Sequence, residues 1–560
     1  MGFAEVLEQV GSTGRFQVIH VTLLSLPVLL MASHNLLQNF VAAVPGHHCA
    51  PANLSAGDPP ASPARLLSAP LDAQGRLLRC RRYTRPQWLL LPGNDSAAAP
   101  ELQNLSSSEL ESCEDGWVYE RTEMSSNIIT EWNLVCELRS LKQMSQTIYM
   151  GGVLVGAMIF GGLSDRFGRR FLLLFSHLLM AVSGTCVAFS QSFSAFCCFR
   201  FMGGAAMSGI ILNSFSLIVE WIPTQIRTIV GTGTGYCYTI GQLVLTAVAY
   251  SIRDWRWLTL AVSLPFYVSF LYSWWLVESA RWLVLNGKED VAVKNLHRVS
   301  RINGRKKEGK KITPETLCSA MHKELSSSRG SHSALDLLRT PGMRRITICL
   351  SCVWFSTSFG YYGLSMDLQK FGVDIYLIQV IFSCVDIPAK FITTVVMALL
   401  GRRPSQSGTL LLAGITVLSN ILVPAELQTV RTSLAVMGKG CLAASFHNCY
   451  LYSGELYPTV IRQNGMGWVS TMARIGSMVA PMVLLLGDLL PSLPGLIYGG
   501  APFVAGIFAL FLPETLGQQL PDTIQDVEER FAGRGPSDVP PIEEELVLKE
   551  VKNSLMKEAI

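Results

Sequence analysis

The octapeptide EWIPTQIR at residues 220–227 returns as ELYPTVIR at residues 455–462, so that the pattern Glu-x-x-Pro-Thr-x-x-Arg occurs twice in the chain. Two further pairs of segments repeat at nearly the same separation, Gly168-Arg169-Arg170 with Gly401-Arg402-Arg403, and Val277-Glu278-Ser279 with Pro513-Glu514-Thr515. Because three separate marks share an offset of 233 to 236 residues (168 to 401, 220 to 455, 278 to 514), the sequence predicts two homologous halves.

Apolar residues fill most of both halves. Of the 560 residues, 49% are apolar and only 15% are charged, which is typical of membrane proteins and not of soluble multidomain enzymes. Runs long enough to cross a bilayer predict twelve spans, at 17–43, 141–161, 172–191, 196–220, 229–251, 256–277, 346–366, 376–400, 407–423, 432–453, 465–490 and 494–512. Since each repeat contains six spans, both halves have the same orientation. The predicted fold is an all-α membrane protein with twelve transmembrane helices in two six-helix pseudo-repeats, the major facilitator fold.

Basic residues lie on one side of the expected membrane. Residues 281–345 include 15 Lys and Arg against six Asp and Glu, and short links on the same side contain further arginines. The positive-inside rule makes these segments cytoplasmic, and the even number of spans places both termini there too. The expected divisions are the N-terminus with the first helix (1–43), an extracellular loop (44–140), the rest of the N-terminal half (141–280), a cytoplasmic linker (281–345), the C-terminal half (346–513) and a cytoplasmic tail (514–560).

The first apolar run is predicted to be a helix and not a signal peptide. It begins after fifteen residues and is longer than the apolar region of a usual signal peptide. Polar residues interrupt it, namely Ser33, His34, Asn35, Gln38 and Asn39. We expect these side chains to form a polar face toward a cavity.

The polar insertion 44–140 has the marks of an extracellular loop. N-glycosylation sequons occur at Asn53, Asn94 and Asn104. The insertion also contains four cysteines, Cys49, Cys80, Cys113 and Cys136. An even number of cysteines in an oxidising compartment predicts two disulfides, with three connectivities open. We interpret the insertion as a folded, glycosylated cap rather than a ligand-binding domain.

The segment GLSDRFGRR at 162–170 combines a glycine turn, one acid and several arginines at a cytoplasmic helix junction. We predict that Asp165 lies near a helix N-terminus and pairs with an arginine across an interface, as part of a charge lock. A charge run that only fixes topology would explain the arginines but not the Gly/Asp spacing. The predicted gating residues are Asp165, Arg166, Arg169, Glu220 and Arg227 in the first half, and Arg402, Glu455 and Arg462 in the second.

One arginine lies deep inside the eleventh expected span. Arg474 is about nine residues, or roughly 14 Å at 1.5 Å per residue, from the start of the run 465–490. Charges at such a depth usually face a water-filled cavity or a partner charge. We interpret Arg474 as a cation that receives an anionic substrate, and the alternative is a structural salt bridge to another helix. Small neighbours suit close helix packing, namely Gly467, Ser470, Ala473, Gly476 and Ser477.

Other charges inside expected spans have simpler explanations. Lys390 follows Asp386 by one helical turn, so the two side chains could neutralise each other. Ligand binding by Lys390 is the other interpretation, and both stay open. Lys439 and Arg200 are nearer the ends of their spans, where the default expectation is that the side chain extends to the membrane surface.

Aromatic residues gather in the fifth, seventh and tenth expected spans. Interfacial belts and core packing account for most such rings. Tyr361 and Tyr362, however, lie between Gly360 and Gly363 and would form a mobile gate on which aromatic solutes stack. A cavity with one or two cations among many rings suits an anion with an apolar body. The rings are Trp354, Phe355, Phe359, Tyr361, Tyr362, Tyr236, Tyr238, Phe446 and Tyr450.

Motifs of enzymes are missing from the sequence. The chain has no His-Glu-x-x-His, Gly-x-Ser-x-Gly or Walker A motif, which disfavours ATP-driven pumping. Gly231-x-Gly233-x-Gly235 lies in an apolar span, where helix packing explains it better than nucleotide binding. We therefore expect no enzyme activity, no metal or cofactor and no nucleic-acid partner.

Together these motifs resemble the organic anion transporters of the solute-carrier organic-ion branch, close to its renal aminohippurate-type and olfactory or renal members. The resemblance extends from residue 1 to about residue 528. It is carried by GRFQ, MASHNLLQNF, PGHHC, DRFGRR, ESARWL, YYGLSMDLQ, VDIPAK, GKGCLAASF, GELYPTVIRQ and STMARIGS.

The resemblance implies a plasma-membrane carrier that works by alternating access without ATP. Such a carrier exchanges an external organic anion (aromatic carboxylates, sulfated conjugates, urate) for an internal dicarboxylate such as 2-oxoglutarate. The substrate-binding residues that it implies are Arg474, Lys390, Asn35, Tyr238, Trp354, Tyr361, Tyr362, Phe446 and Ser470. Tyr450, where relatives often have Phe, completes the predicted set and leaves the substrate preference open.

The residue at position 474 separates the possible functions. In cation-carrying relatives an acid typically takes the place of Arg474, so the arginine favours anions, and the resemblance makes chloride a candidate ligand nearby. The alternatives are a carrier of organic cations or zwitterions with the same fold, and a ligand sensor that does not transport.

Overall fold

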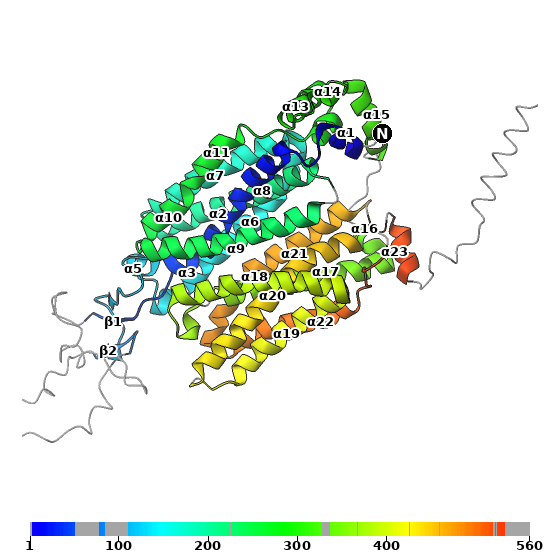
Figure 1. Cartoon of the computed structure of the whole chain (residues 1–560). Coiled ribbons are helices and arrows are strands. Elements are labelled where there is room, and N and C mark those ends of the chain that lie inside the picture. Colours follow the sequence, from blue (N-terminus) through cyan, green and yellow to red (C-terminus); the bar gives the residue numbers. More distant parts are fainter. Residues whose placement is uncertain are drawn as a thin grey trace, which may run out of the picture.

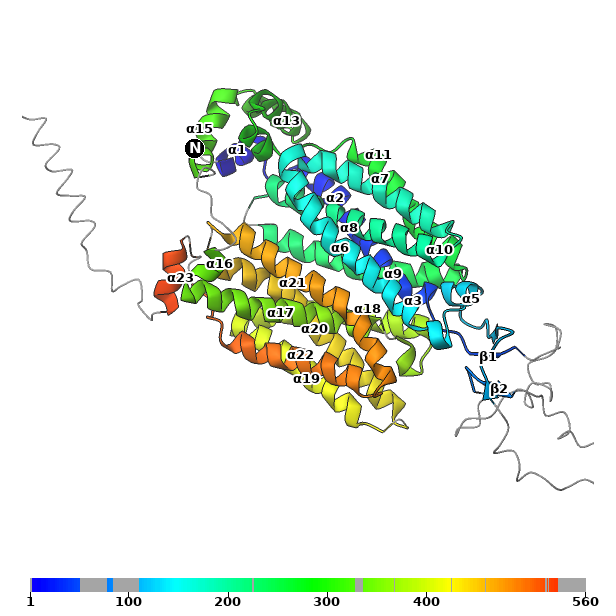
Figure 2. The same ribbon diagram turned by 180° about the vertical axis from the view of Figure 1, so that it is seen from behind.

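The computed structural model describes residues 3–50, 78–83, 110–223, 226–327, 336–366, 368–424, 426–458, 460–518, 521 and 523–531. In this part of the chain, long helices form two bundles that lie side by side (Figure 1). The same arrangement is seen from behind (Figure 2). The predicted all-α fold is confirmed, with two short two-stranded sheets at one end.

The N-terminal bundle is formed by the helices before residue 274. They are α2 (Arg15–Leu36), α3 (Gln38–Val41), α6 (Ser140–Phe167), α7 (Arg169–Ala188), α8 (Phe193–Trp221), α9 (Arg227–Ser251), α10 (Trp255–Ser263) and α11 (Pro265–Ser273). The expected span 256–277 is thus two helices. The break falls at Leu264, since Pro265 has no N–H to continue the helix.

The C-terminal bundle repeats the pattern after a linker of short helices. The linker contains α12 (Ala280–Leu285), α13 (Glu289–Ile302), α14 (Lys306–Gly309), α15 (Pro314–Ser327) and α16 (Asp336–Arg339). The bundle contains α17 (Pro341–Ser365), η5 (Leu368–Phe371), α18 (Ile375–Leu400), α19 (Arg402–Leu422), α20 (Gln428–Leu456), α21 (Arg462–Val483), η6 (Leu484–Asp488) and α22 (Leu493–Leu510). Two terminal helices, α1 (Phe3–Val10) and α23 (Ile524–Phe531), lie with the linker.

Eight segments of the described chain are long and apolar enough to cross a membrane. They are Arg15–Val41, Cys136–Phe167, Arg169–Ala188, Phe193–Trp221, Ile375–Leu400, Arg402–Leu422, Arg462–Asp488 and Leu493–Leu510. The other four expected spans correspond to α9, the α10–α11 pair, α17 and α20. These are helical, but they are shorter or more polar.

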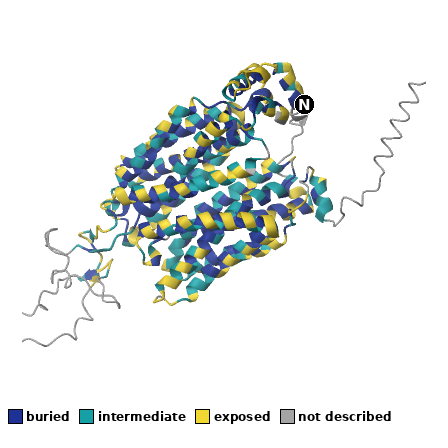
Figure 3. Cartoon of the chain, viewed as in Figure 1, coloured by how far each residue is buried: buried dark blue, intermediate teal, exposed yellow. Residues whose placement is uncertain are grey.

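The outer surface of the bundles is apolar. Figure 3 shows buried residues along the interior faces of the helices and exposed residues along the outer faces. Large apolar side chains are among the exposed residues, for example Leu399, Leu422, Leu271 and Phe391. Exposed apolar surface of this extent is suited to contact with lipid rather than water.

The two ends of the bundles carry different structures. We call the end with the short strands the loop end, and the end with α1, α12–α16 and α23 the linker end (Figure 1). At the loop end, β1 (His47–Cys49) pairs antiparallel with β4 (Trp117–Tyr119), and β2 (Arg82–Tyr83) with β3 (Leu110–Glu111). Helix α5 (Ile128–Trp132) and η3 (Cys136–Leu138) complete this end.

Two disulfides hold the loop end together. Cys49 is bonded to Cys113, and Cys80 to Cys136, which selects one of the three connectivities that the sequence left open. The second bond ties strand segment 78–83 to the start of α6. The predicted glycosylation sites Asn53, Asn94 and Asn104 lie outside the described residues.

The repeated sequence marks take the same geometry in both halves at the linker end. Gly168 and Gly401 have φ angles of 99° and 101° and connect α6 to α7 and α18 to α19. Glu278 accepts the backbone N–H groups of Arg169 and Arg170, at 3.2 and 2.9 Å. In the second half Glu514 accepts those of Arg402 and Arg403, at 2.9 and 3.0 Å. Each glutamate therefore caps the positive end of a helix dipole.

Two arginines of the predicted gating set also form equivalent pairs in the two halves. Arg169 Nε lies 3.5 Å from Glu220 Oε1, and Arg402 Nη2 lies 3.1 Å from Glu455 Oε1. Arg166, Arg227 and Arg462 lie at the same end.

The two capping glutamates differ in the direction of their pKa shifts. Burial raises the pKa of Glu278, although its backbone hydrogen bonds act in the opposite direction. The pKa of Glu514 is lowered, because the hydrogen bonds from the backbone of Leu516, Arg402, Arg403 and Thr515 outweigh the effect of desolvation. Glu514 is the more exposed to water of the two.

The predicted position of Asp165 is wrong. Asp165 lies in the last turn of α6, not at a helix N-terminus, and pairs locally with Arg169 four residues on, at 3.0 Å. Its carboxyl is largely exposed, while the acid that caps the next helix is Glu278. The second half has Ala398 at the equivalent place, so the Asp165 pair is not part of the repeat.

We predict that Gly401→Ala destabilises the protein by about 1–3 kcal/mol. Its φ of 101° and ψ of 171° are accessible to glycine almost alone, and an added Cβ would lie 2.6 Å from Glu514 Oε2. The measurement is thermal unfolding of the purified protein in detergent. Gly408→Ala, whose Cβ would meet no atom within 4 Å, is the matched control and should leave the unfolding temperature unchanged.

Candidate substrate site

Arg474 lies on α21 with its charge uncompensated by an acid. Its Nη1 donates to Ser470 Oγ at 2.5 Å, one turn earlier on the same helix. Within the described residues no carboxylate forms an ion pair with it. Gly476 allows α21 to pack closely against α17, because a Cβ added at this position would lie 2.5 Å from the carbonyl oxygen of Phe355. Among the described residues, the structure therefore shows no salt bridge at Arg474, which was the alternative interpretation of this residue.

Aromatic rings surround this arginine. The side chains of Tyr450 and Tyr362 lie near its guanidinium. Tyr450 packs edge-on against Trp354 at 4.6 Å between ring centroids, yet 56% of it is exposed. Tyr450 lies in the second half of α20, and we call the space beside its accessible face the chamber.

The rings of α17 and α20 form a continuous wall of that chamber. Tyr361 lies edge-on to Tyr362 at 5.5 Å and to Phe446 at 5.4 Å, and Phe446 to Trp354 at 6.3 Å. Trp354 Nε1 donates to Ser453 Oγ at 2.8 Å, which satisfies its one polar atom. Edge-to-face contacts leave ring faces available for a planar substrate.

Asn35 on α2 joins the N-terminal bundle to this wall. Its Nδ2 lies 3.4 Å from Tyr362 Oη and 3.5 Å from Tyr238 Oη on α9, and its Oδ1 accepts from Tyr149 at 2.9 Å. Of the predicted polar face of the first helix, Asn35 and Asn39 contact the C-terminal bundle, whereas His34 and Gln38 contact residues of the N-terminal bundle. All the predicted substrate-binding residues except Lys390 belong to one set of contacts that runs from Ser470 and Arg474 to Asn35 and Tyr238.

Lys390 is not paired with Asp386, and ligand binding by Lys390 stays a prediction. Its Nζ donates to the Gly235 carbonyl and to Thr239 Oγ1 of α9, both at 2.8 Å. The acid one turn away, Asp386, is instead paired with Lys439 at 2.6 Å, and both side chains are 1% exposed. The expectation that Lys439 extends to the membrane surface is therefore wrong, because the buried carboxylate holds its ammonium group inside.

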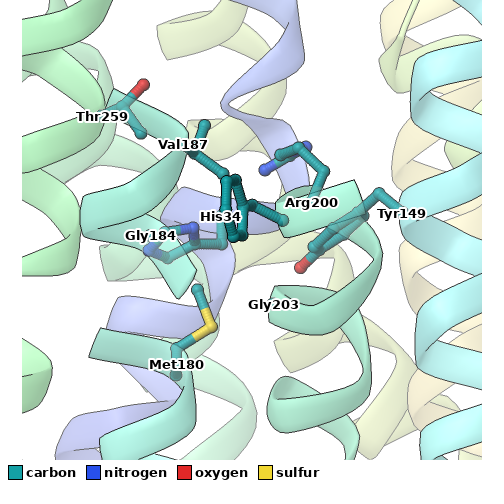
Figure 4. Close-up of a pocket in the computed structure, with 9 residues that line it drawn as sticks. His34, Tyr149, Met180, Gly184, Val187, Arg200, Gly203 and Thr259 are labelled. Carbon is teal, nitrogen blue, oxygen red and sulfur yellow. The ribbon is translucent and has the colours of Figure 1, made fainter. Parts of the chain in front are cut away.

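Arg200 is also buried, contrary to the same expectation. Its guanidinium lies 4.1 Å from the ring centroid of Tyr149 and donates to Gln146 Oε1 at 3.3 Å. A small cavity adjoins it, between α2, α6, α7, α8 and α10 (Figure 4). His34, Met180 and Gly184 are among its other lining residues. Because this cavity is enclosed within the N-terminal bundle, it is separate from the chamber beside Arg474.

The bundles are joined at the loop end. Asn39 Nδ2 donates to the Ser365 carbonyl at 2.8 Å and to Gln379 Oε1 at 3.2 Å. Gln369 exchanges two hydrogen bonds of 3.0 Å with the backbone of Val44. Toward the linker end the two bundles stand apart in both views (Figures 1 and 2). The contacts between the bundles are thus concentrated on the side of the disulfide-bonded loop.

Three glycines in the first half of α9 have no close neighbour in this arrangement, whereas Gly241, farther along, packs against the backbone of Leu29 on α2. A Cβ at Gly231, Gly233 or Gly235 would meet no atom within 4 Å, so the sequence-based explanation by helix packing is wrong here. Gln242, farther along α9, was not identified from the sequence. It donates to Tyr361 Oη at 2.9 Å. The sequence feature that could have pointed to this buried network was the presence of two opposite charges, Asp386 and Lys439, inside expected spans.

The sequence matches known membrane transporters over most of its length. The family described as Sugar (and other) transporter matches residues 99–526. The chain is 68% identical to Solute carrier family 22 member 6 of Danio rerio and 50% identical to Solute carrier family 22 member 20 of Mus musculus, in each case over 100% of both chains. The chain belongs to solute carrier family 22. This confirms the expected kinship with the organic anion transporters of that family, and it makes the protein a transporter and not an enzyme.

A solved transporter shows the same fold. The carrier is similar to the partially occluded inward open conformation of the xylose transporter XylE from E. coli, with a TM-score of 0.56 over 89% of this chain and 98% of that chain. At 16% sequence identity this likeness shows the fold alone, which is that of the major facilitator transporters.

We predict that Lys439→Met destabilises the carrier by about 3–5 kcal/mol, because it leaves Asp386 buried without a counter-charge. Lys390→Met is the matched control: it removes hydrogen bonds to two neutral acceptors and strands no charge. The measurement is the unfolding temperature of the two purified variants. Equal losses in both would show that the Asp386–Lys439 pair has no special structural role.

Proposed function

We propose that the protein is a secondary-active transporter of organic anions and that Arg474 binds the acidic group of the substrate. The observation that carries this proposal is a partly buried guanidinium beside Tyr362 and Tyr450, with no carboxylate partner among the described residues. A desolvated cation without a counter-charge is unfavourable, and an incoming carboxylate or sulfate relieves this. Arginine also presents parallel N–H donors that match both groups.

The rest of the chamber supports an aromatic substrate. The open face of Tyr450 and the partly exposed rings of Phe446 and Tyr362 offer apolar contact to a planar body, while Trp354, 1% exposed, supports Tyr450 from behind. Asn35 and Tyr238 add polar groups from the opposite bundle, so one molecule could touch both halves. Aromatic carboxylates, sulfated conjugates and urate meet these requirements.

We further propose exchange against an internal dicarboxylate such as 2-oxoglutarate by alternating access. The same cation would bind the dicarboxylate on the return, so no ATP is required. Bundles that join at one end and stand apart at the other fit one extreme of such a cycle (Figure 1). Lys390 remains a candidate second cation for the other extreme, and chloride a candidate ligand of Arg474 when no substrate is bound.

The topology that goes with this function has twelve spans in the plasma membrane. The eight apolar segments and the helices α9, α10–α11, α17 and α20 together make up the twelve. The basic linker then lies in the cytoplasm with both termini. The disulfide-bonded loop lies outside, where an oxidising environment preserves its bonds.

Two alternatives make different predictions for transport. A carrier of organic cations would be driven by a negative membrane potential and blocked by quaternary ammonium ions, and a sensor would bind ligand without counterflow. Uptake of labelled aminohippurate, urate, oestrone sulfate and a quaternary ammonium ion, with and without preloaded 2-oxoglutarate, separates these cases. Uptake of the cation alone, or absence of stimulation by the preloaded dicarboxylate, would reject the proposed exchange.

We predict that Arg474→Ala abolishes stimulation by internal dicarboxylate while the protein still reaches the cell surface, since the guanidinium pairs with no acid of the fold. The measurement is aminohippurate uptake into preloaded cells, normalised to surface protein. Arg474→Lys, which keeps the charge, should retain part of the exchange. Undiminished exchange by Arg474→Ala would remove Arg474 from the substrate site.

A further inference from the structure

A buried chain of hydrogen bonds crosses between the bundles near the loop end. Lys439 Nζ pairs with Asp386 Oδ1 at 2.6 Å, and Tyr361 Oη donates to the other carboxylate oxygen, Oδ2, at 3.2 Å. The same phenol accepts a hydrogen bond of 2.9 Å from Gln242 Nε2 on α9. Gln242 is the one member from the N-terminal bundle, and it is completely buried.

The carboxylate decides the direction of this chain. An ionised carboxylate only accepts hydrogen bonds, so the one proton of the Tyr361 hydroxyl must point to Asp386. The lone pairs of the phenol oxygen then face Gln242 and accept a hydrogen bond from its side-chain amide N–H. Gln242 Oε1 in turn lies 3.2 Å from Ser383 Oγ of α18, whose single proton is shared with the nearer Gln379 carbonyl at 2.8 Å. Both ends of the amide therefore contact the C-terminal bundle.

Lys439 makes the carboxylate compatible with a chamber for anions. Its ammonium is held by Asp386 and by the Phe382 carbonyl, at 2.6 and 2.7 Å, and it is 1% exposed. The pair therefore adds no net charge near Arg474. Neither member is accessible to a substrate, which excludes direct binding by Asp386 or Lys439 in this arrangement.

We propose that the Asp386–Lys439 pair is a positioning device that fixes the direction of the Tyr361 hydroxyl, and thereby the hydrogen bond from Gln242 that holds the bundles together at the loop end. Gln242, Tyr361 and Ser383 all lie in the halves of their helices nearer the loop end. Parting of the bundles at that end must break both bonds of Gln242. The device therefore favours the state that is closed at the loop end.

This inference rests on the proposed function in one respect, that the loop end is extracellular and opens during transport. Weakening the hydrogen bond would then raise the population open to the outside. The apparent KM for external anion falls when the competent state is more populated, and the apparent KM for internal dicarboxylate rises. Opposite shifts of two KM values distinguish a change of population from simple loss of folded protein.

The experiment is a double-mutant cycle of Asp386→Asn and Tyr361→Phe. We expect Tyr361→Phe, Gln242→Leu and Asp386→Asn each to lower the external KM and raise the internal KM, by about three- to tenfold for the loss of one buried hydrogen bond. Because Asp386 is proposed to act through the phenol, Asp386→Asn should add nothing in the Tyr361→Phe background. If Asp386→Asn alone does not reach the cell surface, the double variant Asp386→Asn/Lys439→Met, which removes both charges of the pair, takes its place in the cycle.

Two results would overturn the proposal. One is that Asp386→Asn changes only the amount of protein or the maximal rate and leaves both KM values as they are. The other is that it has its full effect in the Tyr361→Phe background. Leu377→Ala, on the exposed surface of the same helix, is the control for nonspecific effects on α18.

A second readout is independent of any substrate. Amide hydrogen exchange of residues 41–44 and 368–371 in the purified protein reports opening at the loop end. It should be faster in Asp386→Asn than in the wild type, and equal in Tyr361→Phe with or without Asp386→Asn. If the wild type takes up no organic anion, the proposed function fails, while this exchange pattern still decides the role of the ion pair.

Discussion

Positive charge buried in an apolar bundle is the constraint on which the interior of this protein depends. Each cation needs a counter-charge, an acceptor or a ring, because burial without one is strongly unfavourable. Lys439 has Asp386, Lys390 has a carbonyl and a hydroxyl of the other bundle, and Arg200 has the face of Tyr149. Among the described residues, Arg474 donates to the hydroxyl of Ser470 and lies near Tyr362 and Tyr450, with no acid paired to it.

The two halves share a frame and differ in their interiors. At the linker end, glycine, arginine and glutamate repeat with the same hydrogen bonds around Gly168 and Gly401. Most of the rings in the chamber, the Asp386–Lys439 pair and Arg474 come from the C-terminal half, while the N-terminal half contributes Asn35, Tyr238 and Gln242. A repeat that fixes the helix junctions leaves the facing surfaces of the two halves free to differ in sequence.

The chemistry of the chamber and the contact between the bundles share one residue. Tyr361 packs on Phe446 and Tyr362, which face the chamber, and its hydroxyl joins Asp386 to Gln242 of the opposite bundle. A substrate that moves these rings would act on the same hydrogen bond that holds the loop end closed. Coupling between binding and movement then needs no long-range pathway, only two arrangements of one phenol.

The sequence by itself determined the helical repeat, the kinship with solute carrier family 22, the depth of Arg474 and the cysteines that form the two disulfides, because periodicity, composition and spacing are local properties of a chain. It misplaced Asp165, Lys439 and Arg200, and it left Lys390 undecided. Whether Asp386 pairs with Lys390 or with Lys439 depends on how α18 and α20 pack. Asp386 and Lys439 are 53 residues apart in the sequence. The tertiary structure alone decided those partnerships, since the energy of a buried charge is set by neighbours distant in sequence.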